Sequence, residues 1–422
     1  MLRGIPPGPL SIDNDCPLMH ILLVAPCAPP KNSPEALQVG RFLAALPANV
    51  RVTLVTTPVV SGWEWGDPSL AVPGGVEQIT IELPFHRLTQ RILRNRHLRR
   101  FHVPDTDFWI TKFARSVADR LSSEVDVIYS RSSPFSAAML GRELKQVLGR
   151  PWLMHLSDPW AGSPYRAASS SPSDFALEDE CVQAADLVSL TTEGQARLYS
   201  ERYPILNGRF VVAPNMAPPA SEFSGLKRTP RPRDCKMRIL HLGSLYGARN
   251  PSAIFEALTR LQGEAPAGSL PFELDFVGNV SEDVARMIDG CACARRRSPV
   301  TYRESRHEML DADLLLSIEP KAYTPLHKHF LMSKVVDYAA SGRPMLALTS
   351  RGSVTDGLCK RGYGWSFEPD DVGGLEEFLR QLGEGRVDVS RAAPTSPAEL
   401  DSALVTAGIL GRLEGIRRGT GP

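Results

Sequence analysis

The stretch that most constrains the fold is Phe330–Thr349, FLMSKVVDYAASGRPMLALT. Apolar residues recur at helical spacing between Val335 and Ala340, and Gly342 can take the left-handed conformation that ends a helix. An apolar run typical of a buried strand follows from Pro344. A helix that leads at once into a buried strand is the second half of a βαβ unit, so the segment predicts a parallel sheet covered by helices.

Two polar residues lie on one face of this predicted helix. Lys334 falls in its first turn, and Asp337 follows about one turn later. Ligands of open parallel sheets bind where helix N-termini meet the carboxyl ends of strands. The pair therefore predicts a phosphate beside Lys334 and a sugar hydroxyl beside Asp337. The alternative is an ordinary amphipathic helix whose lysine and aspartate form a solvated surface pair.

Length and composition indicate a two-domain α/β protein. A chain of 422 residues exceeds one ordinary domain, and its 42% hydrophobic and 23% charged residues are typical of a soluble globular protein. The net charge of +1 gives no general attraction to nucleic acid. Seven cysteines without CxxC spacing predict reduced thiols and no zinc site. No apolar run reaches the length of a membrane span, and residues 1–17 lack a signal-peptide apolar region.

Strand and helix patterns alternate in two blocks. The first begins with the strand pattern His20–Ala25 and ends with Phe210–Pro214, and the second begins with Met237–Gly243 and includes a predicted strand over Val300–Arg303. A passage rich in Pro and Arg separates the blocks. We therefore predict a disordered tail over residues 1–17, a Rossmann-like domain over 18–215, a linker over 216–236, a second Rossmann-like domain over 237–390, and a linker and crossover helix over 391–422.

The loop after Met237–Gly243 carries a second phosphate signal. The sequence GSLYGARN leads into a helix that Asn250 can cap, so backbone amides at the helix start can hold a phosphate with Arg249 beside them. Arg249 and Lys334 then stand on separate βα loops of the same half. Two such cations predict one anion site better than either does alone.

The segment Pro151–Asp158, PWLMHLSD, reads as a buried strand with a polar end. His155, Ser157 and Asp158 fall near its carboxyl edge, where active sites of doubly wound sheets lie. A carboxylate here can orient an acceptor hydroxyl or take its proton. The alternative is that Asp158, which precedes a proline, only caps the following turn.

A basic segment runs from Phe85 to Val103 with six arginines, interleaved leucines and no acid. Such a helix can lie on an anionic membrane surface, so Arg87 to Arg100 predict a membrane contact. The alternative is a solvated surface helix. Nucleic-acid binding is not predicted, because neither aromatic interleaving nor a groove-reading motif is present.

The block SKVVDYAASGRPMLAL resembles the P-S-K-x-x-D/E-Y-x-x-x-G-x-P-x-x-A signature of nucleotide-sugar-dependent glycosyltransferases of the B fold, family 4-like, of the bacterial polysaccharide or cell-envelope type. The element at Asp158, DPW, is similar to the R-D-P-W element of one branch, with Ser157 in place of the arginine. This resemblance implies an α/β protein of two Rossmann-like domains facing a central cleft. The N-terminal domain would bind the acceptor and the C-terminal domain the nucleotide sugar.

The resemblance also implies roles for single residues: Lys334 would bind the donor diphosphate and Asp337 the ribose hydroxyls. Asp158 and His155 are the predicted catalytic residues. His329 stands where relatives have the first of two acids spaced eight apart, so Glu319 or His329 would face the donor sugar, the alternative being that neither does. The first βα loop lacks the glycines that relatives carry there. A metal site is not predicted, because no Asp-x-Asp cluster lies in a plausible loop. The implied donor-binding set is Gly243, Ser244, Arg249, Glu319, His329, Ser333, Lys334 and Asp337.

The predicted activity is metal-independent hexosyl transfer, without a cofactor, from a UDP- or GDP-sugar to a hydroxyl of a glycan or lipid-linked glycan of the cell envelope. The predicted location is the cytoplasm, with the basic segment as a peripheral contact to the inner face of the plasma membrane. A non-catalytic partner subunit of the same fold and a sugar-nucleotide epimerase remain alternatives. A dehydrogenase is disfavoured because neither PCAPPKNS nor GSLYGARN supplies G-x-G-x-x-G.

Overall fold

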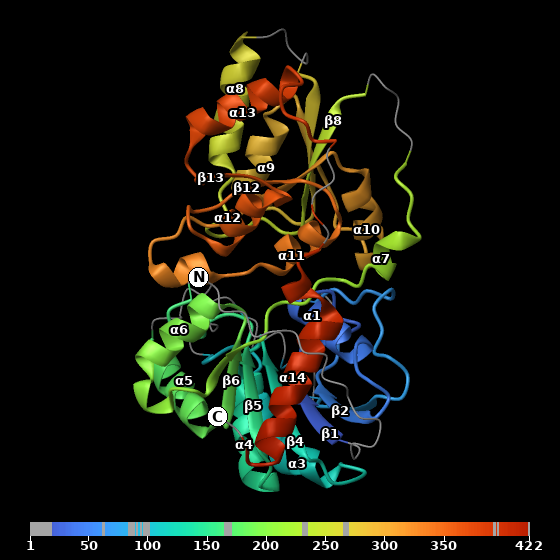
Figure 1. The fold of residues 1–422 in the computed structure, drawn as a ribbon, viewed down its shortest axis with the longest axis vertical. Coiled ribbons are helices and arrows are strands. Elements are labelled where there is room, and N and C mark those ends of the chain that lie inside the picture. The colour runs from blue at the N-terminus through green and yellow to red at the C-terminus, as the bar shows by residue number, and fades with distance from the viewer. Residues whose placement is uncertain are drawn as a thin grey trace.

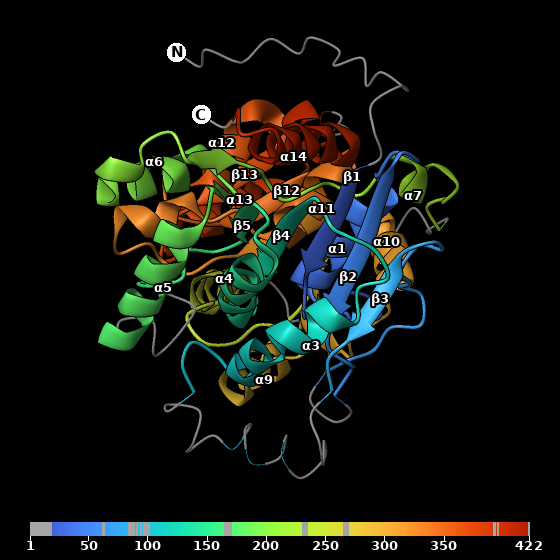
Figure 2. The same cartoon turned by 90° about the horizontal axis from the view of Figure 1, so that it is seen from below.

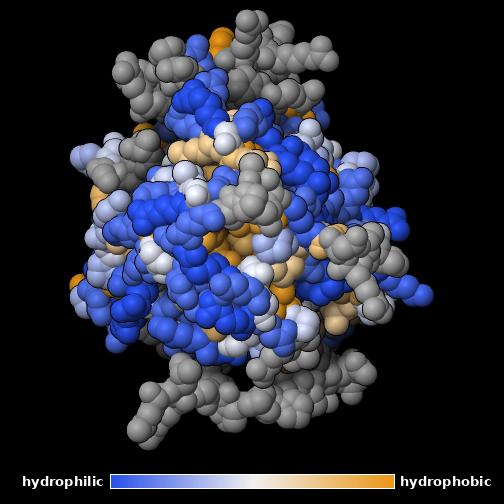
Figure 3. All heavy atoms as spheres, turned by 90° about the horizontal axis from the view of Figure 1, so that it is seen from above, coloured by the Kyte–Doolittle hydropathy of each residue, from blue (hydrophilic) through white to orange (hydrophobic). Residues whose placement is uncertain are grey.

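The computed structural model describes residues 19–60, 64–82, 102–163, 171–229, 235–264, 270–390 and 396–420, with residues 89, 92, 95 and 394. The predicted tail over residues 1–17 lies outside this part, and so does nearly all of the basic segment from Arg87 to Arg100. In the described ranges, no helix is both long and apolar enough to cross a membrane. Seen from above, the end formed by the C-terminal domain is mostly hydrophilic (Figure 3).

The N-terminal domain is built on a parallel sheet with the strand order β3-β2-β1-β4-β5-β6-β7. Its strands consist mainly of buried apolar residues, as expected for a sheet covered on both faces. They are β1 (Met19–Val24), β2 (Val50–Thr56), β3 (Glu77–Thr80), β4 (Val127–Ser132), β5 (Trp152–Leu156), β6 (Leu187–Leu190) and β7 (Phe210–Val212).

Helices cover both faces of this sheet (Figure 2). One face packs against α1 (Pro34–Ala44) and against α14 (Ser402–Arg417), which comes from the C-terminal end of the chain. The other face packs against α3, α4, α5 and α6. These four helices span Ala114–Asp119, Ser136–Leu148, Pro172–Ala184 and Glu193–Arg202.

The C-terminal domain repeats this architecture around a parallel sheet with the order β10-β9-β8-β11-β12-β13. The strands are β8 (Met237–Leu242), β9 (Phe272–Val277), β10 (Ala294–Arg297), β11 (Leu314–Ile318), β12 (Met345–Leu348) and β13 (Gly364–Phe367). One face carries α8 (Ser252–Glu264), α9 (Glu282–Asp289) and α13 (Val372–Gly383). The other carries α10 (Tyr302–Asp311), α11 (Ser333–Ala340) and α12 (Val354–Leu358).

The predicted fold class is confirmed: two Rossmann-like α/β domains lie one above the other, joined by the segment after β7 (Figure 1). The segment that opened the sequence analysis forms α11 and β12, with Lys334 in the first helical turn. Gly342, just beyond the helix, has φ of 71°, the left-handed conformation predicted for it.

Two strand assignments in the C-terminal domain differ from the sequence prediction. The predicted strand over Val300–Arg303 is wrong, because Thr301 caps α10 through a capping box with Glu304. The strand lies earlier, at β10, where three consecutive arginines hide the usual apolar pattern. Glycines at 362 and 364 indicate a turn in the sequence, but Gly364 opens strand β13, and its backbone packs so closely on β12 that an added Cβ would lie 1.8 Å from Met345 O.

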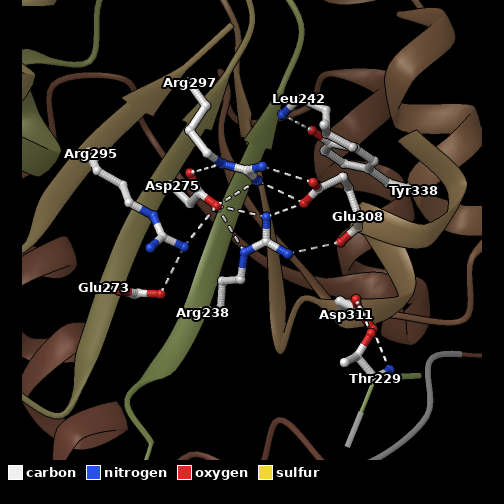
Figure 4. Close-up of polar contacts among 10 residues, drawn as sticks. All are labelled: Thr229, Arg238, Leu242, Glu273, Asp275, Arg295, Arg297, Glu308, Asp311 and Tyr338. Atoms are coloured by element: carbon white, nitrogen blue, oxygen red, sulfur yellow. Dashed lines mark hydrogen bonds and ion pairs between the residues drawn. The ribbon is translucent and has the colours of Figure 1, made fainter. Parts of the chain in front are cut away.

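A buried ionic network ties α10 to this sheet (Figure 4). Asp275 on β9 is fully buried and pairs with Arg238 at 2.6 Å, Arg297 at 2.8 Å and Arg295 at 3.2 Å. Arg238 and Arg297 also pair with Glu308 on α10. Burial alone would raise the pKa of Asp275, but the hydrogen bonds from the arginines together lower it to about 2. The network therefore fixes α10 against β8, β9 and β10.

We predict that Asp275→Asn lowers the free energy of unfolding by about 3–5 kcal/mol, because it leaves the buried guanidinium of Arg238 without its buried carboxylate. The wild type should lose this contribution between about pH 4 and pH 2, since protonation of Asp275 in the folded state requires a pH near 2, below its ordinary range. Urea denaturation, with hydrogen exchange of β8, β9 and β10, measures both effects.

The matched control is Glu273→Gln, which removes one ion pair of Arg295 at a side chain that is 29% exposed. It should cost less than about 1 kcal/mol. Equal destabilisation by both variants would contradict the central role of Asp275.

Candidate active site in the interdomain cleft

A cleft of about 800 Å³ lies between the two domains. Its N-terminal wall includes residues that directly follow β1, β4 and β5, and its C-terminal wall includes residues that follow β8 and β9 together with the start of α11. In doubly wound sheets, this is where ligands bind. Both sheets thus present their carboxyl-end loops to one cavity.

Lys334 lines the C-terminal wall and carries a strongly desolvated ammonium group. Its Nζ donates to His241 Nε2 at 3.2 Å, and His241 Nδ1 donates to Leu316 O at 2.9 Å. Burial, helped by the positive charge of Arg249 and opposed by Glu319, lowers the pKa of Lys334 to about 7. Among the described residues, no carboxylate lies within 4 Å of Nζ, so a bound anion would satisfy this charge.

The loop after β8 brings Gly243, Ser244 and Arg249 to the same wall. Gly243 has φ of 103°, and an added Cβ would lie 3.4 Å from Lys334 Nζ. An added Cβ on Gly278 would lie 2.5 Å from Gly243 O, so the two loops touch backbone to backbone. Asn250 Oδ1 accepts from Ser252 N at 2.9 Å, as predicted for the cap of the following helix.

Asp337 lines the cleft, but its surroundings differ from the predicted ribose site. Its Oδ1 accepts from Arg41 Nη2 at 2.6 Å and its Oδ2 from Arg306 Nη2 at 3.0 Å. The carboxylate is 7% exposed, and each of its oxygens already serves an arginine. The solvated pair with Lys334, the alternative considered for this helix, is not formed either. Ser333 lines the cleft and its Oγ accepts from Gln38 Nε2 at 3.3 Å.

Glu319 and His329 lie outside the set of residues that line the cleft. Glu319 is buried and accepts hydrogen bonds from the hydroxyls of Thr349, at 2.5 Å, and Thr355. His329 packs its ring on helix α6 of the N-terminal domain, where a Cβ on Gly194 would lie 2.1 Å from His329 Nδ1. This geometry does not favour a direct contact between either side chain and a donor sugar.

On the opposite wall, Asp158 lies next to a second carboxylate, Glu35. Glu35 Oε1 accepts from Arg131 Nε at 2.7 Å, and Oε2 accepts from the hydroxyl of Ser157. Burial, helped by the charge of Glu35 and opposed by Arg249, raises the pKa of Asp158 to about 6. A carboxylate with this pKa can accept a proton near neutral pH.

The loop that carries Asp158 is anchored by Trp160, which is fully buried. The indole Nε1 donates to Asp174 Oδ1 at 2.8 Å, and the ring stacks on Phe135 with centroids 5.2 Å apart. Trp160 N also donates to Tyr199 OH at 3.3 Å. The position of Asp158 is therefore fixed by the packing of Trp160 beneath it.

His155 points away from the cleft. It is 1% exposed, is not among the lining residues, and its Nδ1 lies 2.9 Å from Ser189 Oγ. Burial and the nearby charge of Arg131 hold its pKa well below the ordinary range, so the ring is neutral. The position of His155 argues against the catalytic contact predicted for it, because its ring lies beside Tyr129 on the face of the sheet that α1 and α14 cover.

Sequence reasoning missed Glu35, Arg41 and His241. Glu35 lies in the first turn of the helix that follows the first βα loop, and this place in the chain could have indicated a site residue. An acid at a helix start, however, more often only interacts with the helix dipole. Arg41 and His241 act over long separations that no local pattern reveals. Within the described residues, no group of three or more His, Cys, Asp or Glu could hold a metal, and metal independence stays a prediction.

Comparison with known proteins gives a family match within the N-terminal domain. The glycosyl transferase 4-like domain family matches residues 36–216. This range includes Asp158 and Arg41 and ends at the first residue of the predicted linker. A search of curated protein sequences found no match.

Solved structures share the architecture over nearly the whole chain. The trehalose-phosphate synthase (UDP-forming) from Burkholderia xenovorans, in complex with glucose-6-phosphate, is 12% identical, with a TM-score of 0.63 and coverage of 94% of this chain and 100% of that one. The E. coli trehalose-6-phosphate structure bound with UDP-2-fluoro glucose is 12% identical, with a TM-score of 0.62 and coverage of 94% and 99%. A glycosyltransferase from Rickettsia africae is 14% identical, with a TM-score of 0.56 and coverage of 95% and 96%.

The pKa of Lys334 generates a prediction about anion binding. We expect the Kd for UDP to rise by about fivefold from pH 7.5 to pH 8.5, because the free lysine loses its proton above about pH 7 while the diphosphate favours the charged form. Isothermal titration calorimetry should also show proton uptake on binding.

Lys334→Arg is the control, since an arginine stays charged throughout this range. It should bind UDP with little pH dependence. A wild-type Kd that does not change between pH 7.5 and 8.5 would contradict a desolvated lysine at the diphosphate.

Proposed function

The chain contains a glycosyl transferase 4-like domain and has the glycosyltransferase B fold, and from this premise we propose that it transfers a sugar from a nucleotide-diphospho sugar to a hydroxyl acceptor. The observation that carries the proposal is that Arg249, from the loop after β8, and Lys334, from the first turn of α11, line one wall of a cleft whose other wall presents Asp158. A cationic pocket facing a carboxylate suits a diphosphate leaving group and an acceptor hydroxyl.

In the proposed reaction, the bond between the sugar carbon and the diphosphate oxygen breaks, and the acceptor oxygen takes the sugar carbon. Lys334, Arg249 and the amides at the start of α11 stabilise the charge that develops on the leaving diphosphate. Asp158 orients the acceptor hydroxyl and takes its proton. The negative charge of Glu319 favours the protonated form of Lys334.

The proposal extends to the nucleotide, the transferred sugar, the acceptor and the location. UDP is the favoured nucleotide because the E. coli structure above holds UDP-2-fluoro glucose. The transferred group is proposed to be a hexose, and the acceptor a glycan or lipid-linked glycan of the cell envelope. Neither a metal nor a further cofactor is proposed. The proposed location is the cytoplasm, at the inner face of the plasma membrane. The arginines between Arg87 and Arg100 support this proposal, because anionic lipid attracts basic segments.

We predict that Lys334→Ala and Arg249→Ala each lower kcat/KM for turnover of the nucleotide sugar at least tenfold. Each variant removes a cation that stabilises the leaving diphosphate, and a tenfold loss corresponds to about 1.4 kcal/mol of transition-state stabilisation. The assay follows release of the nucleoside diphosphate from UDP- and GDP-sugars. Lys321→Ala and Arg286→Ala, which remove exposed cations outside the cleft, are the controls.

Full activity in both cleft variants would remove the diphosphate assignment. Conversion of the donor to an epimer without acceptor would favour the epimerase instead, and no turnover of any nucleotide sugar would favour the non-catalytic partner.

For Asp158 we predict an acid limb in the pH profile of kcat near pH 6, measured with saturating donor. Activity should rise with pH through this value because the base must be unprotonated. Asp158→Asn should lower kcat about 100-fold and abolish the limb, whereas Asp119→Asn, at an exposed position of α3, should change neither. An unchanged limb in Asp158→Asn would assign the proton to another group.

A further inference from the structure

Helix α1 of the N-terminal domain reaches across the cleft to the donor-side helix α11 (Figure 1). Arg41 of α1 pairs with Asp337 of α11 at 2.6 Å, and Arg306 of α10 pairs with the other oxygen of Asp337 at 3.0 Å. The three side chains are 3%, 7% and 4% exposed. A carboxylate of one domain is thus held between an arginine of its own domain and an arginine of the other.

The same helix also grips the segment that joins the domains. Arg41 Nη1 donates to Met216 O at 2.6 Å. Gln38, one turn earlier, donates from Nε2 to Met216 O at 3.1 Å and accepts from Met216 N at 2.6 Å. Gln38 Nε2 also lies 3.3 Å from Ser333 Oγ, beside Lys334. Two side chains of α1 therefore connect the interdomain segment directly to the first turns of α11.

Tyr302 completes the contact. Its hydroxyl accepts from Arg41 Nη2 at 3.1 Å and donates to Glu222 at 2.6 Å, while its ring lies 4.1 Å from the guanidinium of Arg306. Tyr302 N donates to Asp67 Oδ2, in the N-terminal domain, at 2.6 Å. The contact therefore joins charged and polar groups of both domains, and all of its charged groups would be hydrated if the domains separated.

We propose that Arg41 is a positioning residue that latches the two domains through Asp337, and that this closed arrangement is the one in which transfer occurs. The proposal rests on the proposed function. It assigns Asp337 to closure in place of the ribose contact that the resemblance implied. The donor diphosphate binds to the C-terminal wall in either arrangement, and the latch brings Asp158 of the opposite wall into reach of the reacting carbon.

The test is a double-mutant cycle of Arg41→Gln and Asp337→Asn. Each variant should lower kcat at least tenfold, leave the Kd for UDP within threefold, and increase the radius of gyration measured by X-ray scattering with UDP bound. The double variant should be no worse than either single one, because both remove the same contact. Arg51→Gln, which removes an ion pair of Glu77 within the N-terminal domain, is the control and should leave kcat unchanged.

Wild-type kcat and radius of gyration in Arg41→Gln, or effects that add in the double variant, would overturn the latch. A loss of UDP binding in Asp337→Asn with normal Arg41→Gln would restore the ribose role. Should Arg41→Gln not fold, the nearly isosteric Asp337→Asn carries the test, together with Gly194→Ala, which places a methyl where His329 packs on α6 and should likewise open the domains. If the wild type turns over no nucleotide sugar, the proposed function fails, and the latch fails with it as a device for transfer.

Discussion

The proposed chemistry of the cleft depends on a lysine ammonium that is held out of water beside an arginine. Lys334 has a histidine nitrogen as its hydrogen-bond partner, and the burial that lowers its pKa to about 7 is unfavourable to the free protein. A diphosphate reverses that cost, because it supplies the charge that the site lacks. The backbone beside Lys334 also depends on glycine: Gly278 lets two loops meet where a side chain would intrude, and Gly243 takes a positive φ of 103°.

Charge also organises the route from the C-terminal sheet to the other domain. Asp275 and its arginines fix Glu308, and through it helix α10. The same helix presents Arg306 to Asp337, which in turn meets Arg41 of the N-terminal domain. The donor-side helix is therefore held by an ionic chain that begins in the sheet core and ends across the cleft, so that the relative position of the domains is linked to the geometry around Lys334.

The sequence allowed the prediction of features that are local in the chain. Helix α11, its glycine stop and the cap at Asn250 follow from spacing and backbone chemistry, and Lys334 and Arg249 could be assigned to one wall because parallel strands end at one edge. The ion pair of Asp337 with Arg41 could not be predicted, since the two residues lie 296 positions apart in the chain. Strand β10 was not predicted, because its arginines pair with acids of β9 and α10 that lie outside this segment of the sequence. The direction of the His155 side chain depends on the strand register, which the local sequence does not reveal.

A crystal structure of the protein with UDP tests the central claim most directly. We expect the diphosphate to lie within hydrogen-bonding distance of Lys334 Nζ and against the Gly243 loop, with the Arg249 side chain in contact with it. A diphosphate seated on the N-terminal wall, or bound with Lys334 still turned to His241 and out of reach, would contradict it.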